Sequence, residues 1–197
     1  MDWTAVQTKL GCEADGKPGP LTYTALLAYL AGRPPQMLGT LGAAAAKHIP
    51  EYGIASNASR LANFLGQGCH ETEGFRYLRE IWGPTVAQKG YEGRKDLGNV
   101  YPGDGFRYMG RGVFQVTGRA NYASMGQRIG IELEENPGIV ETPDIAMWTA
   151  CEYWKSRGLS DLADTGQEDT ITRRINGGTN GIDKRRALVA RAKAILS

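Results

Sequence analysis

The sequence is poor in residues that bind metals or build disulfide frameworks. It contains only two histidines, His48 and His70, and three cysteines, Cys12, Cys69 and Cys151. No HExxH or CxxC spacing occurs, so we expect no metal site. A nucleophilic pair of His48 with Cys69 or Cys151 stays open, without support from spacing. An odd number of scattered cysteines is typical of a reducing compartment.

Strong net charge and long apolar runs are also absent. The formal net charge is +2 and the pI is near 8.4, which is too weakly basic to predict a nucleic-acid partner. The chain has no run of about 18 apolar residues and no basic-then-apolar leader. We therefore expect no membrane insertion and no standard signal peptide. At 197 residues the chain is long enough to bury a proper core.

Apolar residues recur at helical spacing along most of the chain, which predicts a mainly all-α fold. Asp2 and Pro20 mark the starts of two short helices within residues 2–31, and Ser56 or Asn57 caps a longer one. Further helices are expected over residues 37–49, 142–158, 167–176 and 183–196, and one that contains Asn121 is expected to run to about Gly130. Residues 83–109 are dense in Gly, Pro, Asp and Asn, and predict an irregular lobe with at most a short hairpin.

Two carboxylates, Glu71 and Glu80, are separated by a break at Gly74-Phe75. On one continuous helix they would point to opposite faces, about 13 Å apart along the axis, and could not act on one bond. If the helix ends near Gly74, the chain can turn and bring Glu80 across a cleft from Glu71. A buried helix end favours protonated Glu71. Spaced acids with water between them suit an inverting glycoside hydrolase.

The run GRGVFQVTGRANY, residues 110–122, supplies polar groups that could serve the same site. Residues 113–117 alternate well enough for a short strand, which would place Gln115 and Thr117 on one side. An amide and a hydroxyl there could bind an N-acetyl group and a water. Asn121 follows on the next expected helix.

Aromatic residues of the irregular lobe could present flat faces to sugar rings, although each could equally serve packing: Tyr91, Tyr101, Phe106 and Tyr108. Glu92 is the rival to Glu80 as the second carboxylate. It lies in YEGRK, which is also typical of an ordinary exposed Glu-Arg pair.

The segment VQTKLGCEADGKPGPLTYTALLAYL, residues 6–30, resembles about half of a peptidoglycan-binding module of the LG…DG…GP type. Pro-rich residues 32–36 follow it and predict a linker. We therefore expect a small helical segment over residues 1–35 and a catalytic domain over residues 36–197. The segment could bind cell wall or merely pack on the domain.

Three motifs in order, HET at 70–72, GRGVFQVTGRANY at 110–122 and INGGTNG at 175–181, resemble the family 19 glycoside hydrolases. That family includes plant-type chitinases and many phage endolysins. LREIW at 78–82 and YPGDGFRYMGRG at 101–112 look like the bacterial and phage branch. The resemblance implies a lysozyme-like, two-lobed helical fold without cofactor.

Carried over by position, the resemblance makes Glu71 the general acid, Glu80 the general base and Thr117 the hydroxyl that holds the nucleophilic water. Plant chitinases carry the second glutamate farther along the chain, which leaves Glu80 less secure than Glu71. The amides that match substrate-binding positions are Gln115, Asn121 and Asn176. Tyr108 is added as an aromatic contact, and Arg185, with Arg186 as the neighbouring alternative, matches an arginine near the acid.

These features together predict an endolysin that hydrolyses β-1,4 bonds of peptidoglycan glycan strands, acting as a monomer. We expect it to stay in the host bacterial cytoplasm until it is released to the cell wall. An endochitinase acting on chitin oligomers is the alternative, because both polymers share N-acetylglucosamine units. A non-catalytic wall-binding protein is the alternative from another class.

Overall fold

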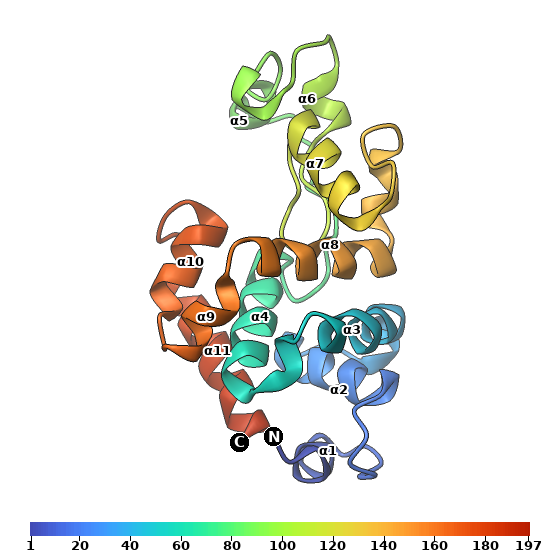
Figure 1. The fold of residues 1–197 in the computed structure, drawn as a ribbon, viewed down its shortest axis with the longest axis vertical. Helices are drawn as coiled ribbons and strands as arrows, with labels where there is room; N and C mark the ends of the chain where they lie inside the picture. The colour runs from blue at the N-terminus through green and yellow to red at the C-terminus, as the bar shows by residue number, and fades with distance from the viewer.

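The computed structural model describes residues 1–197 as two helical lobes joined beside α8 (Figure 1). The large lobe contains α1 (Trp3–Leu10), α2 (Pro20–Ala31), α3 (Gly39–Glu51), α4 (Ala58–Glu71), α8 (Pro143–Ser156), α9 (Leu159–Asp164), α10 (Glu168–Asn176) and α11 (Ile182–Leu196). The small lobe contains α5 (Val86–Lys89), α6 (Asp104–Arg107) and α7 (Arg119–Ile129). Four short 3-10 turns complete the fold: η1 (Pro35–Met37), η2 (Ile54–Ser56), η3 (Lys95–Leu97) and η4 (Pro137–Glu141). The predicted all-α fold is confirmed.

Local sequence signals account for most helix boundaries. The Asp2 side chain accepts a hydrogen bond from the backbone N–H of Ala5 and begins α1. Asn57, rather than Ser56, caps α4 by accepting from the backbone N–H of Arg60. α8 and α10 begin within one residue of the predicted positions, and α3 runs one residue past Pro50 instead of ending before it.

The hairpin and the strand expected in the small lobe do not form. Only two isolated bridges occur, from Arg111 to Arg79 and to Val116. Residues 113–115 form turns in place of a strand, and Gln115 adopts a left-handed backbone with φ +49°. Val113, Phe114 and Val116 are all buried, so their apolar character reflects packing inside a loop.

The core of the large lobe is built around the crossing of α4 and α11. A Cβ placed on Gly66 would lie 2.7 Å from Val189 Cγ2 and 2.9 Å from the Val189 backbone nitrogen, so only glycine permits this approach. Phe64 packs edge-on against Phe114 and Trp154 in the same core. No helix of the fold has both the length and the apolar character needed to cross a bilayer.

The N-terminal helices pack against this core. Leu26, Leu27 and Leu30 of α2 are buried in the same cluster as residues of α3 and α4. A Cβ on Gly42 of α3 would lie 2.7 Å from the backbone of Thr24 of α2, so these helices are in close contact. The boundary expected at residue 35 therefore does not separate two packed units, and whether residues 1–35 bind cell wall stays a prediction.

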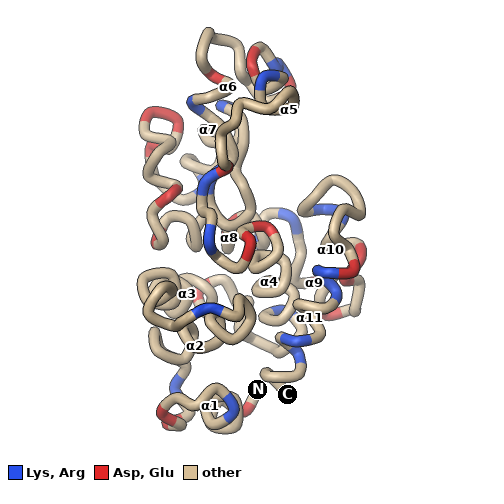
Figure 2. Tube along the Cα trace, turned by 180° about the vertical axis from the view of Figure 1, so that it is seen from behind, with Lys and Arg blue, Asp and Glu red and all other residues tan.

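A separate core and a buried ion pair hold the small lobe together. Its eight buried apolar residues are Tyr108, Val116, Tyr122, Met125, Ile129, Leu133, Val140 and Ile145. Asp104, only 2% exposed, receives two hydrogen bonds from the Arg119 guanidinium, at 2.6 and 2.9 Å, and further ones from the backbone N–H groups of Val100 and Tyr101. Hydrogen bonding by Arg119 holds the pKa of Asp104 below its usual value. Charges of both signs are spread over both lobes, and basic positions recur along α10 and α11 (Figure 2).

We predict that Asp104→Asn lowers the free energy of unfolding by about 1–3 kcal/mol at neutral pH, because it leaves Arg119 without its buried partner. The folded-state pKa of Asp104 lies below its unfolded value of 3.8, so this stabilisation is present above that value and is lost as the pH falls through the folded pKa. Urea unfolding from neutral to acid pH measures both effects. Asp96→Asn, which removes a surface pair with Arg94, is the control and should change little. Equal stability of the Asp104 variant and the wild type would contradict the assignment.

Candidate active site

The end of α4 turns the chain sharply, as the sequence predicted. Gly74 has φ +74°, and Glu73 and Phe75 on either side also adopt left-handed backbone. The Thr72 hydroxyl donates to the Gly68 carbonyl and accepts from the Phe75 N–H, which fixes this turn. Glu71 is thus the last residue of α4, and the extended chain beyond the turn carries Glu80 to the small lobe.

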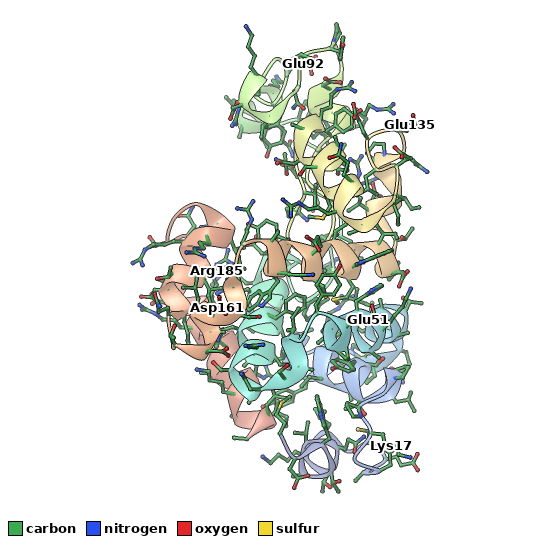
Figure 3. The ribbon with its side chains drawn as sticks, in the orientation of Figure 1. Lys17, Glu51, Glu92, Glu135, Asp161 and Arg185 are labelled. Atoms are coloured by element: carbon green, nitrogen blue, oxygen red, sulfur yellow. The ribbon has the colours of Figure 1, made fainter.

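A buried arginine of α11 holds Glu71. Nη2 of Arg185 lies 2.6 Å from Oε1 of Glu71, and the two side chains are 2% and 19% exposed. No N–H is directed at this buried oxygen, so the contact is an ion pair without an aligned hydrogen bond. Arg185 is itself fixed by Gln67 Oε1, at 2.7 Å, and by the Asn180 carbonyl, at 3.2 Å. Figure 3 shows Arg185 between α10 and α4.

The choice between the two neighbouring arginines is resolved by their partners. Arg186 is exposed and pairs with Asp169 and Asp183 on the outer surface. Arg185 is therefore the one of the two that contacts Glu71. Because its guanidinium is buried beneath Glu71, it positions that carboxylate and is not placed to bind substrate itself.

His70 packs against the INGGTNG loop. A Cβ on Gly181 would lie 2.5 Å from the His70 ring, so the glycine permits this close approach. Burial, and then the positive charge of Arg185, lower the pKa of His70. An imidazole with a lowered pKa that packs against a backbone suits a structural role.

Glu80 is held entirely by groups of the small lobe. Oε1 accepts hydrogen bonds from Gln88 Nε2, at 3.0 Å, and from the Tyr91 hydroxyl, at 3.4 Å. Oε2 accepts from the Gly110 backbone N–H at 3.2 Å, while the Glu80 N–H donates to the Gly110 carbonyl at 2.9 Å. Burial, and then the adjacent Glu80 carboxylate, raise the pKa of Tyr91, so its phenol stays a donor to Glu80.

Gly110 brings Glu80 next to Gln115 and Thr117. A Cβ on Gly110 would lie 2.6 Å from Gln115 Oε1 and 3.2 Å from Thr117 Oγ1. The Thr117 hydroxyl donates to the Gln115 carbonyl, and Asn121 Nδ2 donates to the Thr117 carbonyl. A carboxylate, an amide and a hydroxyl thus meet around one glycine, although the expected strand is absent.

Two open cavities border this arrangement. One, of about 470 Å³, is lined by Gln115, Thr117 and Asn121, and extends to Tyr153 and Ile175. The other, of about 930 Å³, contains Glu80 among its lining residues, together with Trp82, Phe106 and Arg111. The segment 109–117 contributes to both. Asn176 follows Ile175 at the end of α10 and is half-buried, with its amide 3.5 Å from the Asn180 carbonyl.

Two expectations about the small lobe are wrong. Tyr108 is 1% exposed and packs against Tyr122 in the small-lobe core, so it cannot offer its ring face to a sugar. Glu92, the rival carboxylate, accepts hydrogen bonds from the backbone N–H groups of Gly103 and Gly105. Figure 3 shows it at the end of the small lobe remote from Arg185, which contacts Glu71. Glu92 therefore fixes a loop and does not face Glu71.

Residues that support the two carboxylates escaped the sequence analysis. Gln67 lies four residues before Glu71, on the same face of α4, and this spacing was the available signal. Gln88 and Tyr91 carried no comparable signal, because the turn that brings them to Glu80 is irregular. No group of three or more His, Cys, Asp or Glu side chains is arranged to hold a metal ion.

A helical two-lobed protein whose two candidate carboxylates, Glu71 and Glu80, are held in different lobes has an arrangement that suits a glycoside hydrolase. The family of class I chitinases, glycoside hydrolase family 19, matches residues 40–160. The chain belongs to this family, and it is a glycoside hydrolase.

Related proteins occur in bacteria and plants. A glycosyl hydrolase family 19 domain-containing protein of Haemophilus influenzae is 32% identical over 156 residues, covering 66% of this chain and 76% of that protein. An endochitinase of Arabidopsis thaliana is 30% identical over 135 residues, covering 68% of this chain and 48% of the plant protein. The match thus spans about half the length of the plant relative.

The fold is shared with solved chitinases. Chitinase C of Streptomyces griseus superposes with a TM-score of 0.71 at 21% identity, covering 90% of this chain and 93% of that one. A class IV chitinase of Zea mays gives a TM-score of 0.56 at 18% identity, covering 97% and 90% of the two chains. At these identities the likeness concerns the fold.

We predict that Gly110→Ala lowers kcat by about 10–100-fold, because the added methyl group displaces the flexible end of Gln115 and disturbs Thr117 beside Glu80. The melting temperature should change little, since the clash falls on a side-chain end. Gly138→Ala is the matched control, because a Cβ there meets no atom within 4 Å. Initial rates on a soluble oligosaccharide and thermal melts test this. Unchanged rates for the Gly110 variant would contradict the arrangement.

Proposed function

We propose that this protein is an endolysin-type hydrolase that cleaves β-1,4 bonds of the peptidoglycan glycan strand with inversion. The main support for the proposed mechanism is that the two carboxylates, Glu71 and Glu80, are held in different lobes. Glu71 belongs to the large lobe, and Glu80 is bound by Gln88, Tyr91 and Gly110 of the small lobe. An inverting mechanism needs an acid and a base on opposite faces of the sugar, with room for water between them.

Glu71 is the proposed general acid. It donates its proton to the glycosidic oxygen as the bond breaks, leaving a carboxylate. The Arg185 guanidinium, 2.6 Å away, stabilises that carboxylate as it forms. Gln67 and the Asn180 carbonyl keep the guanidinium in place, so the acid does not have to reorganise during the reaction.

Glu80 is the proposed general base. It removes a proton from a water that attacks the anomeric carbon from the face opposite the leaving group. Thr117 is next to Glu80 across Gly110, where its hydroxyl can orient that water. Gln115, Asn121 and Asn176 supply amides for the N-acetyl and hydroxyl groups of the sugars.

The choice of peptidoglycan rests on the N-terminal segment. Its LG…DG…GP pattern resembles wall-binding modules. In the structure this segment forms an ordered turn between α1 and α2. Gln7, buried beneath the turn, donates to Asp15, Lys17 and Thr22 and accepts from the Gly16 N–H. A lytic role would keep the protein, as a monomer, in the host cytoplasm until its release to the wall. Chitin is the second candidate, because several relatives are named endochitinases.

We expect Glu71→Gln and Glu80→Gln each to lower kcat by about 10²–10⁴-fold, because each removes a proton transfer of the proposed reaction. Glu92→Gln is the control, since Glu92 serves only a loop. Reducing-end release, with circular dichroism to confirm folding, makes the comparison. Loss of activity in the Glu92 variant with retention in the Glu80 variant would reverse the assignment of the base.

The polymer is decided by incubating the wild type with purified peptidoglycan and with colloidal chitin. We predict faster release of new reducing ends from peptidoglycan, with no release of free amines. Mass analysis of the products shows which sugar carries the new end. Faster cleavage of chitin would support the alternative hypothesis that the protein is an endochitinase.

A further inference from the structure

We propose that Arg157, assisted by Arg128, forms a subsite that binds a carboxylate of the peptide attached to the glycan strand. This inference rests on the proposed function, because it names the part of peptidoglycan that would distinguish it from chitin. Chitin is an uncharged N-acetylglucosamine polymer, whereas peptidoglycan carries peptides with free carboxylates on its lactyl groups. An unpaired cationic end of the sugar-binding cavity would form a charge-assisted contact with the second polymer that uncharged chitin cannot supply.

Both arginines line the cavity that contains the predicted sugar-binding groups. Arg128 lies near the end of α7 and Arg157 directly after α8, and they share this cavity of about 470 Å³ with Gln115, Thr117 and Asn121. A glycan bound through those amides would thus have two guanidinium groups beside it. α10, along which basic positions recur in Figure 2, contributes Ile175 to the same cavity.

Arg157 is an exposed cation without an acidic partner. No carboxylate lies within 4.0 Å of it, in contrast to Arg119, Arg185 and Arg186, which all form ion pairs. Its guanidinium is centred 4.1 Å from the Tyr153 ring, and its carbonyl accepts a hydrogen bond from Arg174 Nη1 at 2.7 Å. The cation is thus held in place while its donors stay free for a ligand.

Arg128 adds a second, partly neutralised charge. Its Nη1 lies 3.5 Å from Oε1 of Glu152, a mostly buried residue of α8, and its side chain is half exposed. The remaining guanidinium N–H groups are free to face the cavity. Arg128 therefore supports an anion near Arg157 and is the weaker of the two contacts.

Tyr153 connects this subsite to the proposed acid. The Tyr153 hydroxyl donates to the Arg174 carbonyl at 3.1 Å, and its ring contacts Phe114. Burial raises the pKa of Tyr153, with a lowering effect from Arg157 and a raising effect from Glu71, so both charges act on this one ring. Arg157 therefore lies beside Tyr153 in the lining of the cavity that Gln115, Thr117 and Asn121 share, which is the geometric basis of the proposed subsite.

The test compares Arg157→Gln with the wild type on three soluble substrates: peptidoglycan strands with their peptides, the same strands after an amidase has removed the peptides, and chitin hexasaccharide. On intact strands we expect KM to rise about tenfold with little change in kcat, the size of one charge-assisted hydrogen bond. On chitin hexasaccharide, which has no carboxylate, the variant should match the wild type. The amidase frees a lactyl carboxylate on each muramic acid, so the stripped strands stay anionic, and the KM difference should shrink on them because the peptide carboxylates are gone. Arg157→Lys should recover part of the loss, and added salt should raise the wild-type KM on intact strands but not on chitin hexasaccharide.

Arg191→Gln is the matched control. Arg191 is an exposed arginine of α11 stacked on Tyr29 at 4.5 Å, it has no acidic partner, and it lies outside the cavity. It should leave all three reactions unchanged. If Arg157→Gln leaves KM on intact strands unchanged, or lowers activity on all three substrates equally, the subsite is refuted while the proposed function stands. If the wild type releases no reducing ends from either form of the strand, the proposed function fails first.

Discussion

The buried guanidinium of Arg185, next to Glu71, constrains how the helices of the large lobe pack. A guanidinium that is 2% exposed loses most of its hydration, and this loss has to be offset by nearby acceptors. Glu71, Gln67 and the Asn180 carbonyl supply them, from α4 and from the loop before α11. These groups can meet only because Gly66 lets α4 and α11 cross in close contact. A helix-packing detail thus determines where the Glu71 carboxylate lies.

The other carboxylate depends on a different kind of support. Glu80 is held by an amide, a phenol and a backbone N–H of the small lobe, with no charged partner. The backbone of the small lobe is irregular and contains no sheet. The buried Asp104–Arg119 ion pair helps to stabilise this irregular backbone. The two carboxylates therefore differ in their surroundings: a cation lies beside one, and neutral donors surround the other.

The fold was largely predictable from the sequence, because its helices obey local rules. Capping by Asn57, Pro143 at a helix start and the left-handed Gly74 are encoded within a few residues. The small lobe was less predictable, since alternation around Val113 suggested a strand where the structure has buried turns. The sequence does not reveal that Tyr108 is buried, because the residues that cover it belong to the distant elements α7 and η4. The prediction that Tyr108 contacts substrate was wrong for this reason. The motifs drew attention to Glu71, Glu80, Gln115 and Thr117, whose roles stay predictions. The contacts of Gln88 and Tyr91 with Glu80 required the three-dimensional path of the chain.

Because Glu71 is anchored in one core and Glu80 in the other, neither core by itself sets the gap between them. Substitutions that make either lobe more rigid would therefore not constrain this gap directly. A covalent bridge placed across the groove would instead act on it directly, without altering a single catalytic atom. Efforts to raise the working temperature of such an enzyme would therefore do better to restrain the junction beside α8 than to fill cavities within either lobe.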